Sequence, residues 1–410
     1  MCKAHDVPPE PPATTAVPPD RAATAVERPL SVAFDATPLL GRPTGVGAFC
    51  AGALEGLAGR DDVAMTAFAV SWRRRHGIDA LVPTGVHAGS RPMPARPLHA
   101  AWGRGGFPPV EWFVGPADVV HGSNFVVPPT SSAARVVTVH DLTVVRFPEL
   151  CDAPTLAYPR LIRRAVADGA WIHTPSAFVA EEVVDLFGVD PGRVRAVHHG
   201  VPDILGTIPS TQSTEHETPL ALPPGCGRYV LAIGTVEPRK DYPLLVEAFG
   251  AVAAAHPDVA LVIVGGDGWG ADAFDEALRR STVRSRVVRP GYLDGSELAD
   301  VLRGATVLAY PSRYEGFGFP PLQAMAVGVP VVATSAGAVP EVVGDAAWLV
   351  PPGDEDALAA RLVEALDGGD RVEAMIDRGH HHVQGFSWEA CAAGLSHLYR
   401  DAAQATGRPA

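Results

Sequence analysis

The sequence predicts an α/β protein built from two doubly wound halves in tandem, each with a mostly parallel sheet covered by helices on both faces. Short apolar runs typical of buried strands alternate with periodic, helix-like segments along most of the chain. The alternation breaks once, over residues 204–227, where Ser, Thr and Pro accumulate as in an interdomain linker. At 410 residues the chain also exceeds one ordinary core, so two domains are the simplest count.

The first domain is predicted over residues 29–203. It opens with the apolar strand LSVAFDATPLL, followed by the flexible turn GRPTGVG (41–47) and a helix with apolar spacing over 47–59. Further strands are expected at 62–70, 118–122, 134–142, 171–176 and 193–201, with helices at 154–168 and 177–188. In such sheets, ligands bind beyond the carboxyl ends of the strands.

The second domain is predicted over residues 228–385 and repeats the alternation. Its expected strands lie in 227–241, 259–268, 283–293, 306–312 and 329–336, and its helices at 242–257, 272–281, 296–305, 320–328 and 356–367. A final amphipathic helix over 386–405 takes Ser387 as its N-cap.

Composition and net charge limit the classes of molecule that this protein is expected to bind. Hydrophobic residues make up 47% of the chain, as in a globular protein, and the net charge of −13 argues against nucleic acid as a partner. The basic clusters 72–75 and 160–164 are either solvated surface or contacts to anionic lipid or a phosphorylated acceptor. We therefore keep peripheral contact with the inner membrane face as a possibility.

The cysteines and the N-terminus indicate a cytoplasmic protein. The five cysteines form no CxxC pair, which suggests neither a disulfide framework nor a zinc site. Residues 1–28 are rich in Pro, Ala and Thr and are predicted to be a disordered tail, with no apolar stretch typical of a secretory signal.

Two loops of the second domain carry the chemistry. Glu315, Gly316, Phe317, Gly318 and Phe319 follow a strand and precede Pro320, so their amides and a helix N-terminus can receive a diphosphate. The loop GTVEPRKD (234–241) lies at the end of the domain's first strand and brings Arg239 and Lys240 to the same sheet edge. One such loop alone is as well explained by ordinary turn glycines or a solvated basic pair, but two together predict a diphosphate site.

With these motifs, the chain resembles the retaining GT-B glycosyltransferases of family four from about residue 30 to 400. The resemblance implies two Rossmann-like domains, with the C-terminal helix 386–405 crossing back to the first domain. It implies that Arg239 and Lys240 hold the donor phosphates and that Glu315 lies near the donor sugar. The family's second glutamate, separated from the first by seven residues, is replaced here by Gln323, which keeps hydrogen bonding to ribose but loses the charge.

The resemblance also extends to the first domain. Gly45 and Gly47, in GRPTGVGAF, match the family's glycine-rich loop that faces the donor diphosphate. His140 and Asp141 match its HD segment, which implies that His140 contacts the donor sugar and Asp141 helps to place it. Tyr292 either flanks the nucleotide base or simply packs. Glu341 and Gly344 fit the family pattern and are expected to shape the donor domain, whereas the tandem pair 198–199 and the triplet 380–382 of histidines are expected at surfaces or strand ends.

The resulting hypothesis is a metal-independent hexosyltransferase that needs no cofactor. It transfers sugar from a nucleotide-diphosphate donor, GDP-mannose slightly before UDP-sugars, to a glycan, lipid-linked or small-molecule acceptor with retention of configuration. The two cations and the helix dipole carry the leaving-group charge. A Rossmann oxidoreductase is disfavoured because GxGxxG is absent after the first strand. The alternative is a non-catalytic GT-B module that binds a sugar nucleotide or a partner, favoured only by Gln323.

Overall fold

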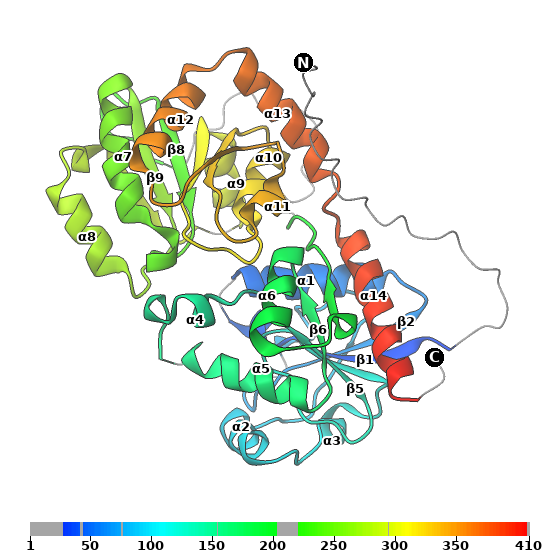
Figure 1. Ribbon diagram of the computed structural model, residues 1–410. Helices are drawn as coiled ribbons and strands as arrows, with labels where there is room; N and C mark the ends of the chain where they lie inside the picture. Colours follow the sequence, from blue (N-terminus) through cyan, green and yellow to red (C-terminus); the bar gives the residue numbers. More distant parts are fainter. Residues whose placement is uncertain are drawn as a thin grey trace, which may run out of the picture.

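The computed structural model describes residues 28–41, 44–74, 77–153, 155–202, 220–293 and 295–407. The predicted tail, apart from Arg28, and most of the predicted linker lie outside these residues. In the described part, two parallel sheets, each flanked by helices, form two domains that face each other (Figure 1). The predicted α/β class with two doubly wound, Rossmann-like domains is confirmed.

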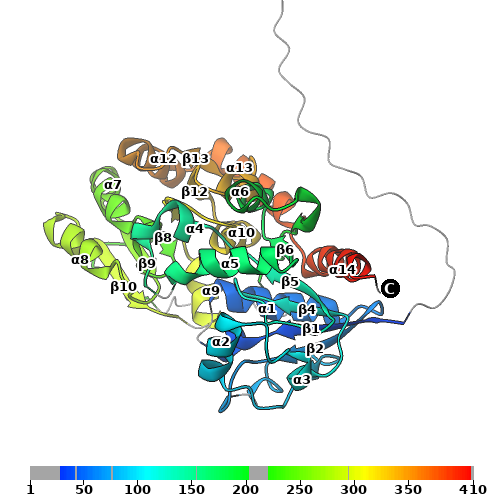
Figure 2. The same ribbon diagram turned by 60° about the horizontal axis from the view of Figure 1, so that its bottom comes forward.

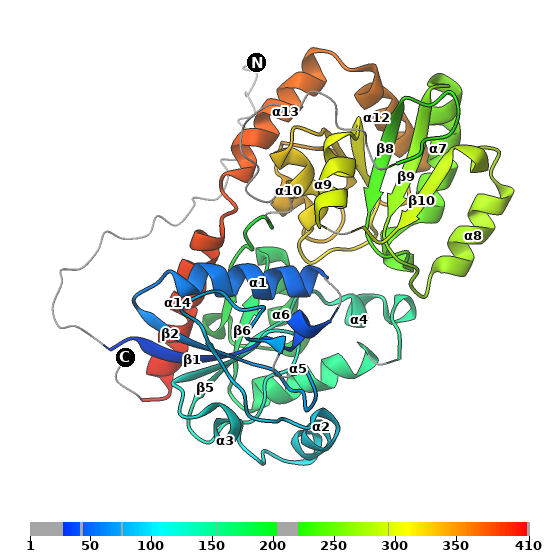
Figure 3. The ribbon, with the colours of Figure 1, turned by 180° about the vertical axis from the view of Figure 1, so that it is seen from behind.

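The first domain contains a seven-stranded parallel sheet. Its strands are β1 (Leu30–Asp35), β2 (Val63–Phe68), β3 (His87–Ala88), β4 (Val119–Gly122), β5 (Ala134–Thr138), β6 (Trp171–Thr174) and β7 (Val194–Ala196). Its helices are α1 (Gly45–Ala58), α2 (Ala95–Arg104), α3 (Glu111–Val114), α4 (Thr143–Arg146), α5 (Tyr158–Ala167) and α6 (Ala177–Phe187). Figure 2 shows α2 and α3 at the lower edge of this domain, and Figure 3 shows α1 between the sheet and the second domain.

The second domain contains a six-stranded parallel sheet. Its strands are β8 (Arg228–Ile233), β9 (Val259–Val264), β10 (Val287–Gly291), β11 (Val307–Tyr310), β12 (Val331–Thr334) and β13 (Trp348–Val350). The helices of this half are α7 (Tyr242–Ala255), α8 (Ala271–Arg280), α9 (Gly295–Arg303), α10 (Phe319–Ala326), α11 (Val339–Val343), α12 (Glu355–Asp367) and α13 (Asp370–Val383). The last helix, α14, spans Trp388–Ala405.

The strand orders place the functional edge of each sheet. They run β3-β2-β1-β4-β5-β6-β7 and β10-β9-β8-β11-β12-β13, so the order reverses between β1 and β4 and between β8 and β11. Loops that leave two neighbouring strands at such a point diverge to opposite faces, which opens a crevice at their carboxyl ends. The loops after β8 and β11 carry the residues that the sequence singled out.

The strands follow the expected burial of parallel sheets. All six residues of β9 are buried, because helices cover both of its faces. The predicted strand 134–142 ends earlier, at Thr138, since the Asp141 side chain accepts a hydrogen bond from the Thr143 amide (3.0 Å) and turns the chain. The sequence pattern does not predict helix α13, because it is polar on most sides; packing against α10 stabilises this helix.

The C-terminal helix docks on the first domain. The Ser387 hydroxyl accepts from the Ala390 amide (3.1 Å), which is the predicted N-cap of α14. Side chains of α14 share one hydrophobic core with α1 and β1, and Figure 3 shows α14 running beside α1. Trp388 enters this contact where Gly52 and Gly56 leave room: a methyl group on Gly52 would overlap the indole ring.

We therefore predict that Gly52→Ala destabilises the protein by about 1–3 kcal/mol, because an overpacked contact must displace Trp388 or α14. The matched control is Gly103→Ala in α2, where no atom lies within 4 Å of the new methyl group. It is expected to stabilise by roughly 0.5–1 kcal/mol through helix propensity. Urea unfolding of both variants measures the two changes. Equal stability of the two variants would show that the glycine is not required for docking.

Candidate functional site

The loop after β8 holds two adjacent cations at the edge of the second sheet. A single 3-10 turn, Pro238–Lys240, projects Arg239 and Lys240 toward the loop that follows β11. Asp241, directly after them, adopts a left-handed conformation (φ 50°), and its carboxylate pairs with Arg313 at 2.8 Å. This pairing fixes the end of the cationic turn.

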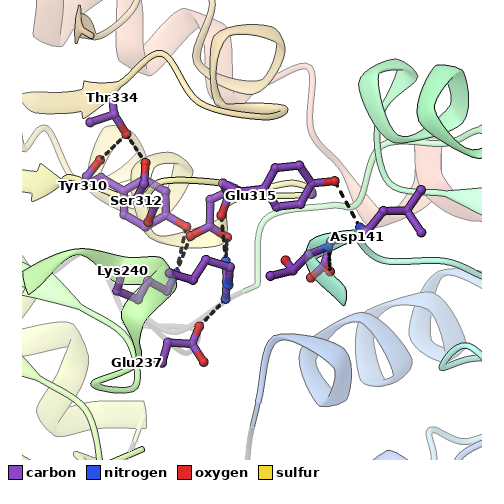
Figure 4. Close-up of polar contacts among 12 residues, drawn as sticks. Asp141, Glu237, Lys240, Tyr310, Ser312, Glu315 and Thr334 are labelled. Carbon is purple, nitrogen blue, oxygen red and sulfur yellow. Dashed lines mark hydrogen bonds and ion pairs between the residues drawn. The ribbon is translucent and has the colours of Figure 1, made fainter. Parts of the chain in front are cut away.

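Glu315 joins both cations in a buried ion network (Figure 4). Its Oε1 lies 2.6 Å from Lys240 Nζ, and its Oε2 accepts from Arg239 Nη1. A second carboxylate, that of Glu237, accepts from Arg239 Nη2 at 2.6 Å. The Glu315 and Lys240 side chains are only 7% and 10% exposed. Two positive and two negative charges thus balance in a nearly dry site.

The charges set the protonation state of Glu315. Burial alone would raise the pKa of its carboxyl, but Arg239 and Lys240 outweigh burial and lower the pKa to about 2. Burial acts in the opposite sense on Lys240, whose pKa is lowered despite its contact with Glu315. The Lys240 ammonium also lies 4.8 Å from the centre of the Tyr310 ring and 3.2 Å from its hydroxyl. The Glu315 carboxylate is therefore ionised at neutral pH, and so is Arg239, whose pKa the surrounding carboxylates raise well above its ordinary value despite burial.

The glycine loop after Glu315 makes the contact with the first domain. A side chain on Gly316 would overlap the His140 carbonyl oxygen, so glycine is required for this approach. Gly318 is the N-cap of α10 with φ 117°, and Pro320 and Pro321 occupy the first turn of that helix. The Phe317 ring is buried instead of facing an open crevice. The N-terminus of α10 thus faces the first domain.

His140 and Asp141 of the first domain face the glycine loop that follows Glu315. His140 Nε2 donates to the Ser123 carbonyl oxygen (2.8 Å), which leaves Nδ1 as an acceptor. Burial lowers the pKa of His140, so its ring is neutral at pH 7. Asp141 lies beside Gly316 and acts electrostatically on Arg239. These two residues therefore lie next to the glycine loop and the cations.

The two glycines of the first loop differ in their availability. Gly45 begins α1 and faces the Phe319 ring: a methyl group on Gly45 would lie 3.7 Å from ring carbon Cδ2, an ordinary contact. The Gly47 amide already donates to the Thr44 hydroxyl, the N-cap of α1 (3.2 Å). The Gly47 amide is thus less available than the Gly45 amide to donate a hydrogen bond to a diphosphate.

Tyr292 and Gln323, the two other expected donor contacts of the second domain, differ in exposure. Tyr292 follows β10 with its side chain 51% exposed, which leaves its ring free to meet a ligand. Gln323 lies one turn into α10 and is 7% exposed.

Three residues of the second domain make contacts with the first domain that sequence reasoning missed. The Tyr314 hydroxyl bonds to Glu182 of α6 and accepts from the Leu142 amide (3.1 Å). The Trp269 indole donates to the Leu150 carbonyl oxygen at 2.9 Å. Glu341, expected to shape only the donor domain, reaches His198 of the first domain at 2.7 Å. No local pattern signals such pairs, because each joins residues more than a hundred positions apart.

His198 and His199 lie just beyond the end of β7, one of the two positions expected for them, and His199 is buried there. It is 2% exposed and stacks on Phe49 at 4.4 Å between ring centres. Among the residues that the structure describes, neither of its ring nitrogens has a hydrogen-bond partner. Burial holds the pKa of His199 well below its ordinary value. The triplet 380–382 lies at the end of helix α13, where His380 and His381 are exposed, as expected for surface residues. Within the described residues, no group of three His, Cys, Asp or Glu side chains could hold a metal ion.

No helix in the described ranges combines the length and apolarity needed to cross a membrane.

Comparison with known proteins gives the family. The model for Glycosyltransferase Family 4 matches residues 43–203, and that for Glycosyl transferases group 1 matches residues 227–368. An O-antigen chain mannosyltransferase B of Escherichia coli is 29% identical, over 69% of this chain and 74% of the relative. A D-inositol 3-phosphate glycosyltransferase of Segniliparus rotundus is 30% identical, over 65% of this chain and only 61% of the relative.

Solved structures share the two-domain architecture. Sucrose-phosphate synthase from Thermosynechococcus elongatus superimposes with a TM-score of 0.65 at 19% identity, covering 90% of this chain and 98% of the other. HepE from Anabaena, in complex with UDP and glucose, gives a TM-score of 0.64 at 16% identity, with coverage of 90% and 98%. The fold is therefore GT-B, and with the two family models it shows that the chain belongs to the group 1 glycosyltransferases of family 4.

Proposed function

We propose that this chain transfers a hexose from a nucleotide-diphosphate sugar to an acceptor hydroxyl, with retention of configuration. The observation that carries the proposal is the buried network of Arg239, Lys240 and Glu315, next to the N-terminus of α10 and opposite His140. Two cations and a helix N-terminus in one dry site suit a diphosphate leaving group.

The proposed reaction uses these charges in one step. The bond between the anomeric carbon and the diphosphate oxygen breaks, and the acceptor oxygen bonds to that carbon from the same face. The acceptor proton passes to the departing phosphate oxygen. Arg239 and Lys240 stabilise the charge that develops on the diphosphate, so the reaction needs no metal ion. Glu315 and the acceptor nitrogen of His140 orient the sugar hydroxyls.

The donor is proposed to be GDP-mannose, with UDP-sugars second. The mannosyltransferase name of the Escherichia coli relative supports mannose as the sugar. The complex of HepE with UDP supports uridine nucleotides as the second choice. The Gly45 amide and Tyr292 are proposed to contact the diphosphate and the base, and Gln323 the ribose. A neutral amide at Gln323 weakens that contact relative to a carboxylate.

The acceptor is proposed to be a glycan, lipid-linked or small-molecule hydroxyl compound, in polysaccharide biosynthesis. The O-antigen name of the same relative supports a glycan. A cytoplasmic site of action at the inner membrane face fits exposed Arg160 on α5. The second candidate, a non-catalytic module that binds a sugar nucleotide, is favoured only by Gln323.

We predict that one nucleotide family raises the melting temperature in a panel of GDP, UDP, ADP, TDP and their common sugars, with a chelator present. Ligand at 10 to 100 times its dissociation constant stabilises by roughly 1.4–2.7 kcal/mol, which a melting curve detects. The shift should disappear in Arg239→Ala. No shift with any nucleotide would contradict the proposed donor site, and binding without transfer or donor hydrolysis would favour the non-catalytic module.

Replacing either cation is expected to impair transfer. Arg239→Ala or Lys240→Ala should lower kcat/KM by roughly 30- to 1000-fold, about 2–4 kcal/mol, because a preorganised charge is lost in a buried site. Arg280→Ala is the control, since its exposed side chain (69%) lies on α8. Initial rates with the donor found in the panel measure the effect. Unchanged turnover in either cation variant would remove that residue from the mechanism.

A further inference from the structure

The N-terminus of α6, in the first domain, is capped by a carboxylate from the second domain. Glu341 Oε1 accepts from the Ala177 amide (2.8 Å), and Oε2 accepts from the Phe178 amide (2.9 Å). The hydroxyl of Ser176 accepts from the next amide, that of Val179 (3.3 Å). The first amides of a helix have no partner within the helix, so Glu341 supplies acceptors that α6 lacks.

The carboxylate is well matched to this position. The positive end of the helix dipole favours an anion, and His198 Nε2 adds a third contact to Oε1 at 2.7 Å. Burial would raise the pKa of Glu341, but His198 and the two amides outweigh it and lower the pKa. The contact therefore joins an ionised group of one domain to three donors of the other.

The same junction is tied to the catalytic loop at two points. On one side of the junction, the Ser176 hydroxyl donates to the Gly316 carbonyl oxygen (2.8 Å). On the other side, the Ala338 amide, at the start of α11, donates to the Glu315 carbonyl oxygen (2.8 Å). Glu341 lies in α11, so a short rigid path connects its carboxylate to the backbone of Glu315.

We propose that Glu341 is a positioning residue that clamps α6 and so sets the distance between Glu315 and the His140 wall during transfer. The inference rests on the proposed function, because this distance matters only if a sugar is transferred across the crevice. The two cations proposed to bind the diphosphate, Arg239 and Lys240, belong to the second domain, and Glu341 does not contact them. The Gly45 amide is the proposed diphosphate contact from the first domain. Loss of Glu341 should therefore affect the transfer step more than nucleotide binding.

The test compares Glu341→Ala, Glu341→Gln and the control Glu389→Ala, an exposed carboxylate near the domain crossing. For Glu341→Ala we expect kcat to fall roughly ten- to hundredfold, because His140 would be misplaced relative to Glu315. The nucleoside diphosphate dissociation constant should change far less than kcat, because Arg239 and Lys240 stay in place and only the proposed Gly45 contact comes from the first domain. Glu341→Gln keeps one carbonyl acceptor, so its kcat should lie between those of the wild type and Glu341→Ala. Small-angle X-ray scattering should show a larger radius of gyration for Glu341→Ala than for Glu389→Ala.

Two results would overturn the clamp. One is a Glu341→Ala enzyme with the kcat and radius of gyration of the control. The other is a fall in kcat that merely follows loss of thermal stability, with unchanged scattering and no recovery in Glu341→Gln. If the wild type neither binds nucleotides nor transfers sugar, the proposed function fails, whereas the scattering comparison still decides whether Glu341 holds the domains.

Discussion

The buried carboxylate of Glu315, held between Arg239 and Lys240, is the interaction on which the site depends. Glu315 and Lys240 are 75 positions apart in sequence. They meet because β8 and β11 are neighbours where the strand order reverses, so both loops leave the same sheet edge. Removing one partner from a buried ion pair costs far more than an exposed pair is worth. The sheet order, the cationic turn and the glycine loop thus depend on one another.

This network also bears on how the proposed diphosphate would bind. In the structure, carboxylates from Glu315 and Glu237 neutralise the two cations. A diphosphate that enters must compete with Glu315 for them, and the released carboxylate is then free to accept hydrogen bonds from sugar hydroxyls. The backbone of Gly316 packs directly on His140, so the first domain lies next to Glu315.

Much of the fold and part of the site could be predicted from the sequence, because both leave local patterns. Alternating apolar runs predict the two sheets, and the motifs around Arg239 and Glu315 stand at strand ends where parallel strands bring them together. The contacts of Tyr314 with Glu182 and of Glu341 with α6 could not be predicted, since they depend on the relative placement of two domains. Of the two positions expected for His199, a surface or a strand end, the structure shows the strand end. Its burial by three separate segments could not be predicted, because a histidine pair after a strand resembles a polar turn. The hydrogen bond from the Gly47 amide to the Thr44 hydroxyl caps helix α1. The glycine-rich pattern of this loop does not predict it.

Titration of a nucleoside diphosphate into wild type and Glu315→Gln tests this account most directly. If Glu315 occupies the cations in place of a diphosphate, the variant loses the competitor and should bind the nucleoside diphosphate more tightly, while transfer from the sugar nucleotide falls. Calorimetry gives both dissociation constants, and melting curves establish that the variant is folded. Weaker or absent binding by a folded Glu315→Gln protein would contradict the account, because Arg239 and Lys240 would then not be the diphosphate site that Glu315 holds in readiness.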